Sequence, residues 1–331
     1  MKADRLPRNL VEAICYFSDP DRAFAYVVRM RWADGPVICP RCDHDQTSFI
    51  ASRRIWRCGG CKKQFSLKVG TIFEDSPLGW DKWLPAIWLI ANSKNSVSSH
   101  EMARSLGVTQ KSAWFMLHRI REAMKAGSFQ KMTGTTEVDD TFIGGLAKNM
   151  HHKVRKERIH GTGGMDKLVV QGARNRDSGT VVAEVIPTES ARVIQRNICR
   201  WLEDGSTLYT DTHKSYNGIE SRGYALKQVN HSAGEYVCGD VHTNGIENFW
   251  SLLKRSIKGT QIHVHGAHLQ RYVNERTFAY NERSASDLGR MTAAMTGVSG
   301  RRLTWAALTA DTKTYGRPAI WQPSFDALEF L

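Results

Sequence analysis

Apolar residues recur at helical spacing in the first third of the chain. Residues 1 to about 34 are predicted to be helical, and Asp19 followed by Pro20 is typical of a helix start. From residue 78 to residue 126 the pattern is again helical, with a wide apolar stripe. These segments predict a mostly α-helical N-terminal region.

Two consecutive helices in this region are joined by a short turn that contains glycine. Ser98 and Glu101 form a capping-box pattern at the start of the first helix, Gly107 lies in the turn, and Thr109 precedes the second helix. This arrangement predicts a helix-turn-helix, whose second helix reads the major groove of DNA. The side chains expected outward for DNA contact are Gln110, Lys111, Trp114 and His118, with Arg119 nearby. An ordinary helical hairpin that fills a core has the same pattern.

After a stretch at residues 126–136 that resembles a linker, strand and helix signals alternate. Strands are predicted at 137–143, 167–173, 180–186, 207–210 and 226–229, and helices at 190–203, 246–257 and 267–283. This order predicts a mixed α/β sheet with helices packed on it.

The net charge of the chain indicates what kind of partner it binds. The 331 residues include 46 Lys and Arg against 33 Asp and Glu, a formal net charge of +13. Such a surplus indicates an anionic partner, and nucleic acid is the first candidate. The apolar content of 41% excludes a disordered basic tail. No apolar run approaches the ~18–20 residues of a membrane span, and no signal-peptide core is present, so we expect a cytoplasmic protein that joins the nucleoid when it binds DNA.

Four cysteines have the spacing of a zinc ribbon. Cys39 and Cys42 form one Cys-x2-Cys pair, and Cys58 and Cys61 form another after fifteen intervening residues. Two such pairs can direct four thiolates toward one structural Zn²⁺. Two disulfides are the alternative, but they require an oxidising compartment. The surrounding segment, 35–72, is rich in Lys and Arg, which favours nucleic-acid binding over the alternative of a protein-docking ribbon.

Three acidic residues lie at strand and helix positions from which carboxylates can converge on one catalytic site. Asp139 lies in the first predicted strand, Asp211 at the end of a later strand, and Glu247 in the first turn of a helix. Converging carboxylates repel one another unless cations neutralise them, and Mg²⁺ or Mn²⁺ suits that task. Two such ions ~3.5–4 Å apart promote phosphoryl transfer.

Each acid also has a structural alternative. Asp140 competes with Asp139 because strand alternation alone does not choose between neighbours. Asp211 can form a turn, and Glu247 follows Asn244 at capping-box spacing. Lys254 lies two helical turns after Glu247 on nearly the same face, where it can hold a DNA phosphate. The further DNA-binding candidates Arg255 and Lys258 extend this basic side.

The acids lie within three motifs that resemble the catalytic blocks of bacterial insertion-sequence DDE transposases. The motifs are Glu137-Val-Asp139-Asp140-Thr-Phe-Ile-Gly144-Gly145, Tyr209-Thr-Asp211, and His242-Thr-Asn-Gly-Ile-Glu247-Asn-Phe-Trp-Ser-Leu-Leu-Lys254-Arg255. The similarity runs from about residue 20 to residue 283 and points to the zinc-ribbon group related to the Merlin elements. This resemblance implies a ribonuclease H-like fold, in which Asp139, Asp211 and Glu247 bind two metal ions and Lys254 contacts DNA. The resemblance also favours Asp139 over Asp140.

The expected protein is multidomain and acts on DNA. Its predicted parts are a helical segment (1–34), a zinc ribbon (35–72), a helix-turn-helix domain (73–128), a catalytic domain (132–283) and a C-terminal extension (284–331). The expected function is binding of terminal inverted repeats, metal-dependent 3′-end cleavage and strand transfer into target DNA, with a homo-oligomer on paired ends. The alternatives are a DNA-binding regulator with a non-catalytic α/β domain, and a ribonuclease or resolvase.

Overall fold

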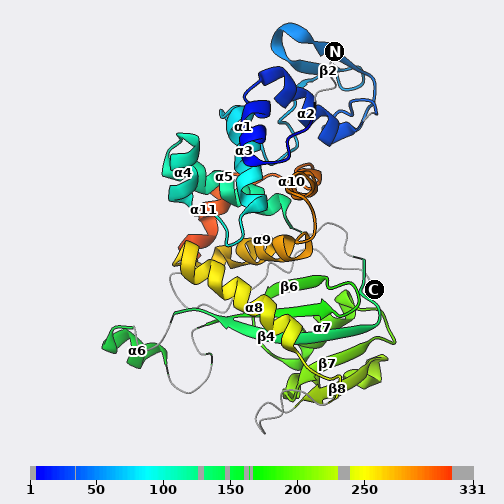
Figure 1. Ribbon diagram of the computed structural model, residues 1–331, viewed down its shortest axis with the longest axis vertical. Coiled ribbons are helices and arrows are strands. Elements are labelled where there is room, and N and C mark those ends of the chain that lie inside the picture. Colours follow the sequence, from blue (N-terminus) through cyan, green and yellow to red (C-terminus); the bar gives the residue numbers. More distant parts are fainter. Residues whose placement is uncertain are drawn as a thin grey trace. The chain divides into compact units, whose positions relative to one another are not determined.

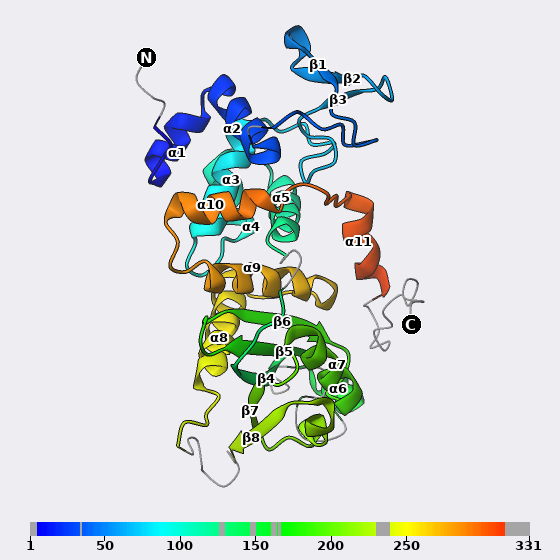
Figure 2. The same cartoon turned by 90° about the vertical axis from the view of Figure 1, so that its right-hand side faces the viewer.

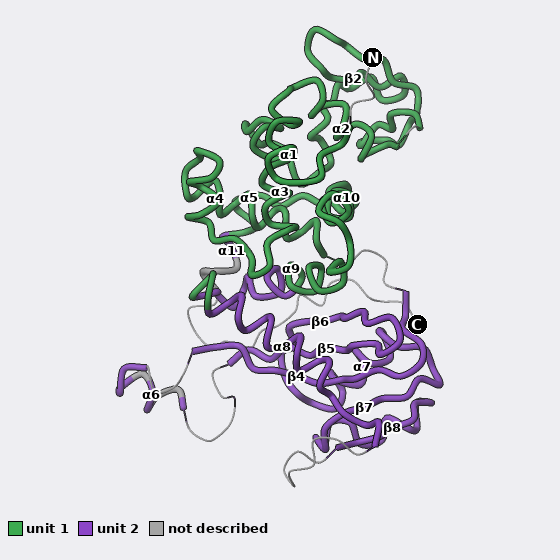
Figure 3. The backbone as a smooth tube through the Cα atoms, viewed as in Figure 1, with its two compact units in different colours: residues 1–127, 259–262, 274–308 green, residues 128–258, 263–273, 309–331 purple. Residues whose placement is uncertain are grey.

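The computed structural model describes residues 5–33, 35–125, 130–145, 150–159, 164, 167–229 and 239–314. The chain divides into two compact units (Figure 3). Unit 1 comprises residues 1–127, 259–262 and 274–308, and unit 2 comprises residues 128–258, 263–273 and 309–331. None of the helices in the described ranges combines the length and apolar character needed to cross a bilayer.

Unit 1 is mainly helical. Its helices include α1 (Leu10–Phe17), α2 (Pro20–Trp32), α3 (Trp80–Asn92), α4 (Ser99–Leu106), α5 (Gln110–Ala123) and α10 (Asp287–Thr296) (Figure 1). The predicted helix starts are confirmed, because the side chains of Asp19, Ser98 and Thr109 each accept a backbone N–H in the following turn. Gly107 ends α4 with φ of 65°, a left-handed conformation that glycine adopts without strain.

The zinc ribbon is a small antiparallel sheet within unit 1. Its strands β1 (Thr47–Ile50), β2 (Ile55–Cys58) and β3 (Gln64–Ser66) lie in that order. The buried Trp56 of β2 stacks on Phe24 of α2, with ring centroids 5.6 Å apart, and on Phe65 at 6.0 Å. Aromatic packing therefore joins the ribbon to α2.

The segment after residue 284, predicted as a C-terminal extension, contributes a helix to the core of unit 1. The buried side chains Met291, Ala294 and Met295 of α10 belong to the core of unit 1. Arg290 Nε donates to Asn92 Oδ1 of α3 at 2.7 Å. Helix α11 (Trp305–Thr314) follows, and residues 315–331 lie outside the described part of the chain.

Unit 2 contains a five-stranded mixed sheet. Its strands are β4 (Thr135–Ile143), β5 (Leu168–Asn175), β6 (Val181–Ile186), β7 (Thr207–Asp211) and β8 (Ala225–Val229), in the spatial order β6-β5-β4-β7-β8. The first three strands pair antiparallel, whereas β4, β7 and β8 run parallel. This topology confirms the expected mixed α/β domain. Helix α6 (His152–Arg158) lies between β4 and β5 in sequence, and α9 (Leu269–Asn281) follows the sheet.

Two helices cover opposite faces of this sheet (Figures 1 and 2). Helix α7 (Ala191–Trp201) packs Ile194 and Ile198 in a core with Val138 of β4. Helix α8 (Asn244–Ser256) lies on the other face, where Trp250 approaches Gly172 of β5. Because side chains alternate along a strand, Glu137 and Asp139 share the face toward α8.

Candidate active site and metal centres

The four predicted zinc ligands lie together. The Sγ atoms of Cys39, Cys42, Cys58 and Cys61 are all within 4.8 Å of one another. Two of the separations are 3.8 Å (Cys39 to Cys61) and 3.5 Å (Cys42 to Cys58). A tetrahedron with Zn–S bonds of ~2.3 Å has edges of ~3.8 Å, whereas a disulfide bond is only ~2.05 Å long. The arrangement fits one zinc ion and excludes the two disulfides.

Tight backbone turns shape both cysteine pairs. The residues that follow Cys42 and Cys61 both have positive φ, 54° at Asp43 and 59° at Lys62. In the first pair, the His44 backbone N–H lowers the pKa of Cys42 to about 6. A thiolate is the form that binds zinc, so this turn favours the ligand state.

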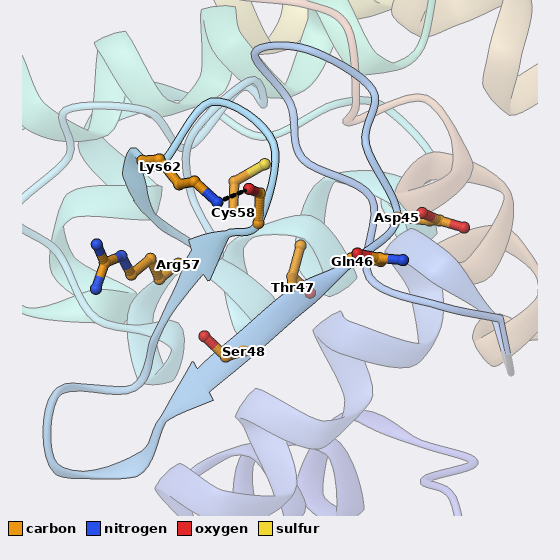
Figure 4. A pocket seen from close by; sticks show the side chains of 8 residues that line it. Asp45, Gln46, Thr47, Ser48, Arg57, Cys58 and Lys62 are labelled. Atoms are coloured by element: carbon orange, nitrogen blue, oxygen red, sulfur yellow. Dashed lines mark hydrogen bonds between the residues drawn. The ribbon is translucent and has the colours of Figure 1, made fainter.

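A hollow of about 630 Å³ lies beside the second cysteine pair (Figure 4). Its lining consists of polar, basic and backbone groups from Asp45, Gln46, Thr47, Ser48, Arg57, Cys58, Gly59 and Lys62. The Lys62 ammonium donates to the carbonyl oxygen of Gly59. Basic and hydrogen-bonding side chains therefore flank the zinc site.

The three predicted catalytic acids come from neighbouring elements of unit 2. Asp139 lies on β4, Asp211 ends the adjacent parallel strand β7, and Glu247 lies in the first turn of α8. All three side chains are half-buried. Burial raises the pKa of Asp139 to about 6, and the negative charges of Asp211 and Glu247 add to this effect. The three carboxylates are therefore close enough to interact electrostatically.

A different donor orients each carboxylate. Trp250 Nε1 donates to Asp139 Oδ2 at 3.0 Å, although this tryptophan was given no role from the sequence. Asp211 Oδ1 accepts the backbone N–H of His213 at 3.1 Å, so the turn-forming alternative is also realised. Thr243 Oγ1 donates to Glu247 Oε1 at 3.0 Å.

The alternative capping role of Glu247 is not realised. Asn244 lies inside α8, because the residue that precedes the helix is Thr243. The side chain of Thr243, the N-cap residue, does not accept a backbone N–H of the first turn. The Asn244–Glu247 capping box is therefore absent from the described start of α8.

The carboxylates are spread more widely than the cysteines. Within the described residues, the four cysteine sulfur atoms form the only group of three or more candidate metal-ligand atoms that all lie within 4.8 Å of one another. Two ions ~4 Å apart, each ~2.1 Å from its oxygen ligands, need ligand atoms spread over up to ~8 Å. Carboxylate oxygens are hard ligands of the kind that divalent cations such as Mg²⁺ and Mn²⁺ prefer.

Asp140 has a different environment from Asp139. Burial raises its pKa to about 9, together with a hydrogen bond to Glu189 and the charge of Asp139. Glu189 precedes α7, which covers the face of the sheet opposite to α8. Asp140 is thus a hydrogen-bonded partner of Glu189, and Asp139 is the carboxylate that meets α8.

Basic residues continue along α8 from the carboxylates. Lys254 is half-buried, and burial lowers its pKa. The charges of Lys258 and Lys167 act in the same direction, whereas Asp139 acts against them. Lys254 therefore lies within electrostatic reach of Asp139, and Arg255 and Lys258 are exposed beyond it. The sequence did not single out Lys167, because it precedes a strand and belongs to none of the three motifs.

The predicted DNA-contact residues of α5 fall into two groups. Gln110 and Lys111 are exposed, and Trp114 packs edge-to-face against Trp305 with ring centroids 5.7 Å apart. His118 and Arg119 are buried, at 0% and 3% exposure.

The expected outward orientation is wrong for His118, and Arg119, which was expected to lie near the DNA contacts, is also buried. Arg119 donates to the carbonyl oxygens of Leu303, at 3.1 Å, and of Glu74. The chain segment around residue 303 covers this side of α5, and no local pattern in α5 signals that cover.

Comparisons with known proteins match two segments of the chain to families. Residues 131–281 match the family model of the ISXO2-like transposase domain, and residues 18–64 match that of the transposase zinc-ribbon domain. A protein in transposable element ISH50 of Halobacterium salinarum is 28% identical over 251 residues, which are 72% of this chain and 83% of that protein. A transposase-like protein of Haemophilus influenzae is 26% identical over 101 residues, 30% of this chain and 80% of that protein.

A solved structure was also found. The match to the catalytic core domain of BIV integrase covers 43% of this chain and 82% of the integrase chain, with 17% sequence identity and a TM-score of 0.28. The two family matches together span more than half of the chain and include both the cysteine cluster and the three acids. The chain therefore belongs to the DDE transposases of insertion sequences, in which a zinc ribbon precedes an ISXO2-like transposase domain.

Proposed function

We propose that Asp139, Asp211 and Glu247 are the catalytic carboxylates of this transposase and hold two Mg²⁺ or Mn²⁺ ions. The observation that carries the proposal is the origin of the three side chains on β4, at the end of the adjacent parallel strand β7 and in the first turn of α8, a helix that Trp250 joins to Asp139. The charges of Asp211 and Glu247 add to the effect of burial in raising the pKa of Asp139. When bound, such ions activate the attacking oxygen and stabilise the leaving oxygen of a phosphodiester. The expected reactions are hydrolysis that frees a 3′-OH at each element end, followed by its transfer to target DNA.

The surrounding residues support this chemistry by orientation and charge. Trp250 and Thr243 each donate to one oxygen of a carboxylate, which fixes the direction of the other. Lys254 lies within electrostatic reach of Asp139 and is placed to hold a DNA phosphate beside the ions. Arg255 and Lys258 extend the surface for the DNA backbone.

DNA recognition is assigned to the ribbon and the helix-turn-helix. In the ribbon, the exposed Arg57 and Lys62 flank the zinc site. In α5, Gln110 and Lys111 are exposed at the N-terminal turn, the position from which recognition helices reach base edges. His118 and Arg119 are not among the proposed contacts. We expect these elements to bind the terminal inverted repeats, with an oligomer of the chain on paired ends.

Strand cleavage by Asp211→Asn tests the catalytic assignment. The variant loses one negative ligand, so cleavage of a labelled inverted repeat in Mg²⁺ should be abolished while binding of the same DNA is retained. Glu203→Gln is the matched control, because it removes an exposed carboxylate from the same unit and should leave cleavage intact. Full cleavage activity in Asp211→Asn would overturn the assignment.

A further inference from the structure

Glu137 is a buried carboxylate that the proposed chemistry does not use. Its side chain is 0% exposed, although it lies on β4 only two residues before Asp139. Arg174 Nη1 and Arg176 Nε each lie 3.4 Å from its Oε1, and His242 Nδ1 lies 3.7 Å from the same oxygen. A buried charge is costly unless it is paired and hydrogen-bonded, and the two guanidinium groups satisfy this requirement.

The second oxygen of Glu137 holds the first turn of α8. Its Oε2 accepts the backbone N–H of Ile246 at 2.8 Å. The first N–H groups of a helix have no acceptor within the helix, and the side chain of the N-cap residue Thr243 accepts none of them. A carboxylate at this end also interacts favourably with the helix dipole. Glu137 therefore supplies from a neighbouring strand the cap that the local sequence lacks.

Close approach at this point leaves no room for a side chain at Gly245. A Cβ there would lie 2.6 Å from Glu137 Oε2 and 2.5 Å from Arg174 Nη1. Real Cβ atoms essentially never come so close to other heavy atoms. A side chain at Gly245 would therefore displace the carboxylate of Glu137 or the guanidinium of Arg174.

Two contacts fasten α8 to β4, on either side of Glu247. Glu137 holds Ile246, and Asp139 accepts the hydrogen bond of Trp250. The two strand residues are ~6.6 Å apart, and the two helix residues are ~6 Å apart along the helix axis. Because both contacts join α8 to the same strand, together they fix the position of Glu247, which lies between them in sequence, relative to β4.

We propose that Glu137 is a positioning residue of the metal site, which acts through the first turn of α8 to hold Glu247 at a set distance from Asp139. The inference rests on the proposed metal-binding role of these carboxylates. Arg174 and Arg176 engage Oε1 of Glu137 and the Ile246 N–H engages Oε2, so Glu137 acts through α8 and not as a ligand. Without this anchor Glu247 shifts relative to Asp139, and the divalent ions bind more weakly.

Mn²⁺ binding to the full-length protein, measured without DNA from the paramagnetic resonance signal of free Mn²⁺, tests the proposal. Glu137→Ala removes the acceptor for Ile246, and the affinity should fall about tenfold or more, the usual effect of losing a group that supports a metal ligand. Glu137→Gln retains an oxygen that can accept the Ile246 N–H, so it should recover part of the affinity. Gly245→Ala pushes the start of α8 from Glu137 and should weaken binding as well.

Val138→Ala separates positioning from general destabilisation. Val138 is buried on the opposite face of β4, in the core beneath α7. Its truncation should lower the melting temperature but leave both the Mn²⁺ affinity and the hydrogen exchange of the Ile246 amide as in the wild type. In Glu137→Ala, the same amide should exchange faster.

The possible outcomes distinguish this inference from the proposed function. If Asp211→Asn retains cleavage, the proposed function fails. If Asp211→Asn abolishes cleavage but Glu137→Ala binds Mn²⁺ as the wild type does, or no more weakly than Val138→Ala, only the positioning role is refuted. Should Glu137→Ala not fold, Glu137→Gln and Gly245→Ala compared with the wild type decide the same question.

Discussion

Trp250 of α8 donates its indole N–H to Oδ2 of Asp139 on β4 over 3.0 Å. The indole occupies the space beside Gly172 that a side chain would need, because a Cβ there would lie 2.6 Å from its Cη2. Burial and the charges of Asp211 and Glu247 raise the pKa of Asp139, whereas the hydrogen bond from Trp250 lowers it. Trp250 therefore orients one carboxylate oxygen and supports the ionised form that a metal ligand requires.

Trp250→Phe should slow cleavage while the protein remains folded. Phenylalanine retains most of the apolar packing but cannot donate to Asp139. A hydrogen bond to a charged group contributes about 1.5–3 kcal/mol, so the single-turnover rate on a labelled inverted repeat should fall roughly tenfold or more. Trp201→Phe, which alters a buried indole of α7 on the other face, should lose stability but not rate. Equal rates in the two variants would contradict the role of the indole N–H.

Asp139→Asn should stabilise unit 2 when no divalent ion is added. The pKa of Asp139 is raised from 3.8 to about 6, so the ionised carboxylate costs free energy only in the folded state. The cost is absent below about pH 3.8, grows as the pH rises to about 6, and is then constant at roughly 1–3 kcal/mol. The gain in unfolding free energy for Asp139→Asn should therefore be larger at pH 7.5 than at pH 5.

Unfolding by urea, followed by hydrogen exchange of the sheet amides, measures this difference. Added Mn²⁺ should reverse the order, because the wild type has the ligand that the variant lacks. Glu203→Gln again serves as the control, since its exposed carboxylate lies outside the cluster. A variant less stable than the wild type throughout this pH range would contradict the mutual repulsion of the three acids.

Elements with strong local signals were predictable. The helix starts at Asp19, Ser98 and Thr109 depend on side-chain caps within three residues, so the sequence contains both partners. The strand expected at 137–143 is observed as Thr135–Ile143, because alternating and β-branched residues favour a strand irrespective of its neighbours. The zinc site was also predictable, because the Cys-x2-Cys spacing by itself indicates that the two thiolates of each pair point toward one ion.

Features that depend on distant segments were not predictable. Strand alternation alone left Asp139 and Asp140 open, because their surroundings depend on which face of β4 receives α8, a helix about a hundred residues later. Burial of Arg119 depends on the carbonyl of Leu303, and α10 returns to α3 across nearly two hundred residues. Helical periodicity describes one apolar stripe, but α5 has neighbours on more than one side. The role of Glu137 was likewise hidden, since its partner Ile246 contributes only a backbone N–H.

Removal of zinc should unfold the ribbon and weaken DNA binding. Cys58→Ser removes a buried ligand, and binding of a structural zinc ion contributes about 10–16 kcal/mol in small zinc domains. The packing of Trp56 on Phe24 and Phe65 should then be lost, which changes the tryptophan fluorescence. Elemental analysis and titration with inverted-repeat DNA check both effects. Cys199→Ser, outside the cluster, should keep its zinc and its affinity. Full affinity in a zinc-free Cys58→Ser protein would show that the ribbon does not contribute to DNA binding.

Lys111→Ala should weaken DNA binding, whereas Arg119→Ala should lower stability, although both remove a positive charge from α5. Lys111 is exposed, with its ammonium 4.5 Å from the Trp305 ring centroid, so its loss should weaken end binding and reduce the salt dependence of the affinity by about one counterion. Arg119 is buried and donates to Leu303 and Glu74, so its loss should lower the melting temperature by leaving buried carbonyl groups without a donor.

Affinity as a function of salt and thermal unfolding, measured on the same two proteins, distinguish these effects. The stable fraction of Arg119→Ala should bind inverted-repeat DNA with the salt dependence of the wild type, because a buried guanidinium releases no counterion. If Arg119→Ala instead reduces the salt dependence as Lys111→Ala does, α5 must expose this side chain when it binds DNA. The contact between Arg119 and Leu303 would then break on binding, and the sequence-based assignment of Arg119 to the DNA surface would be restored.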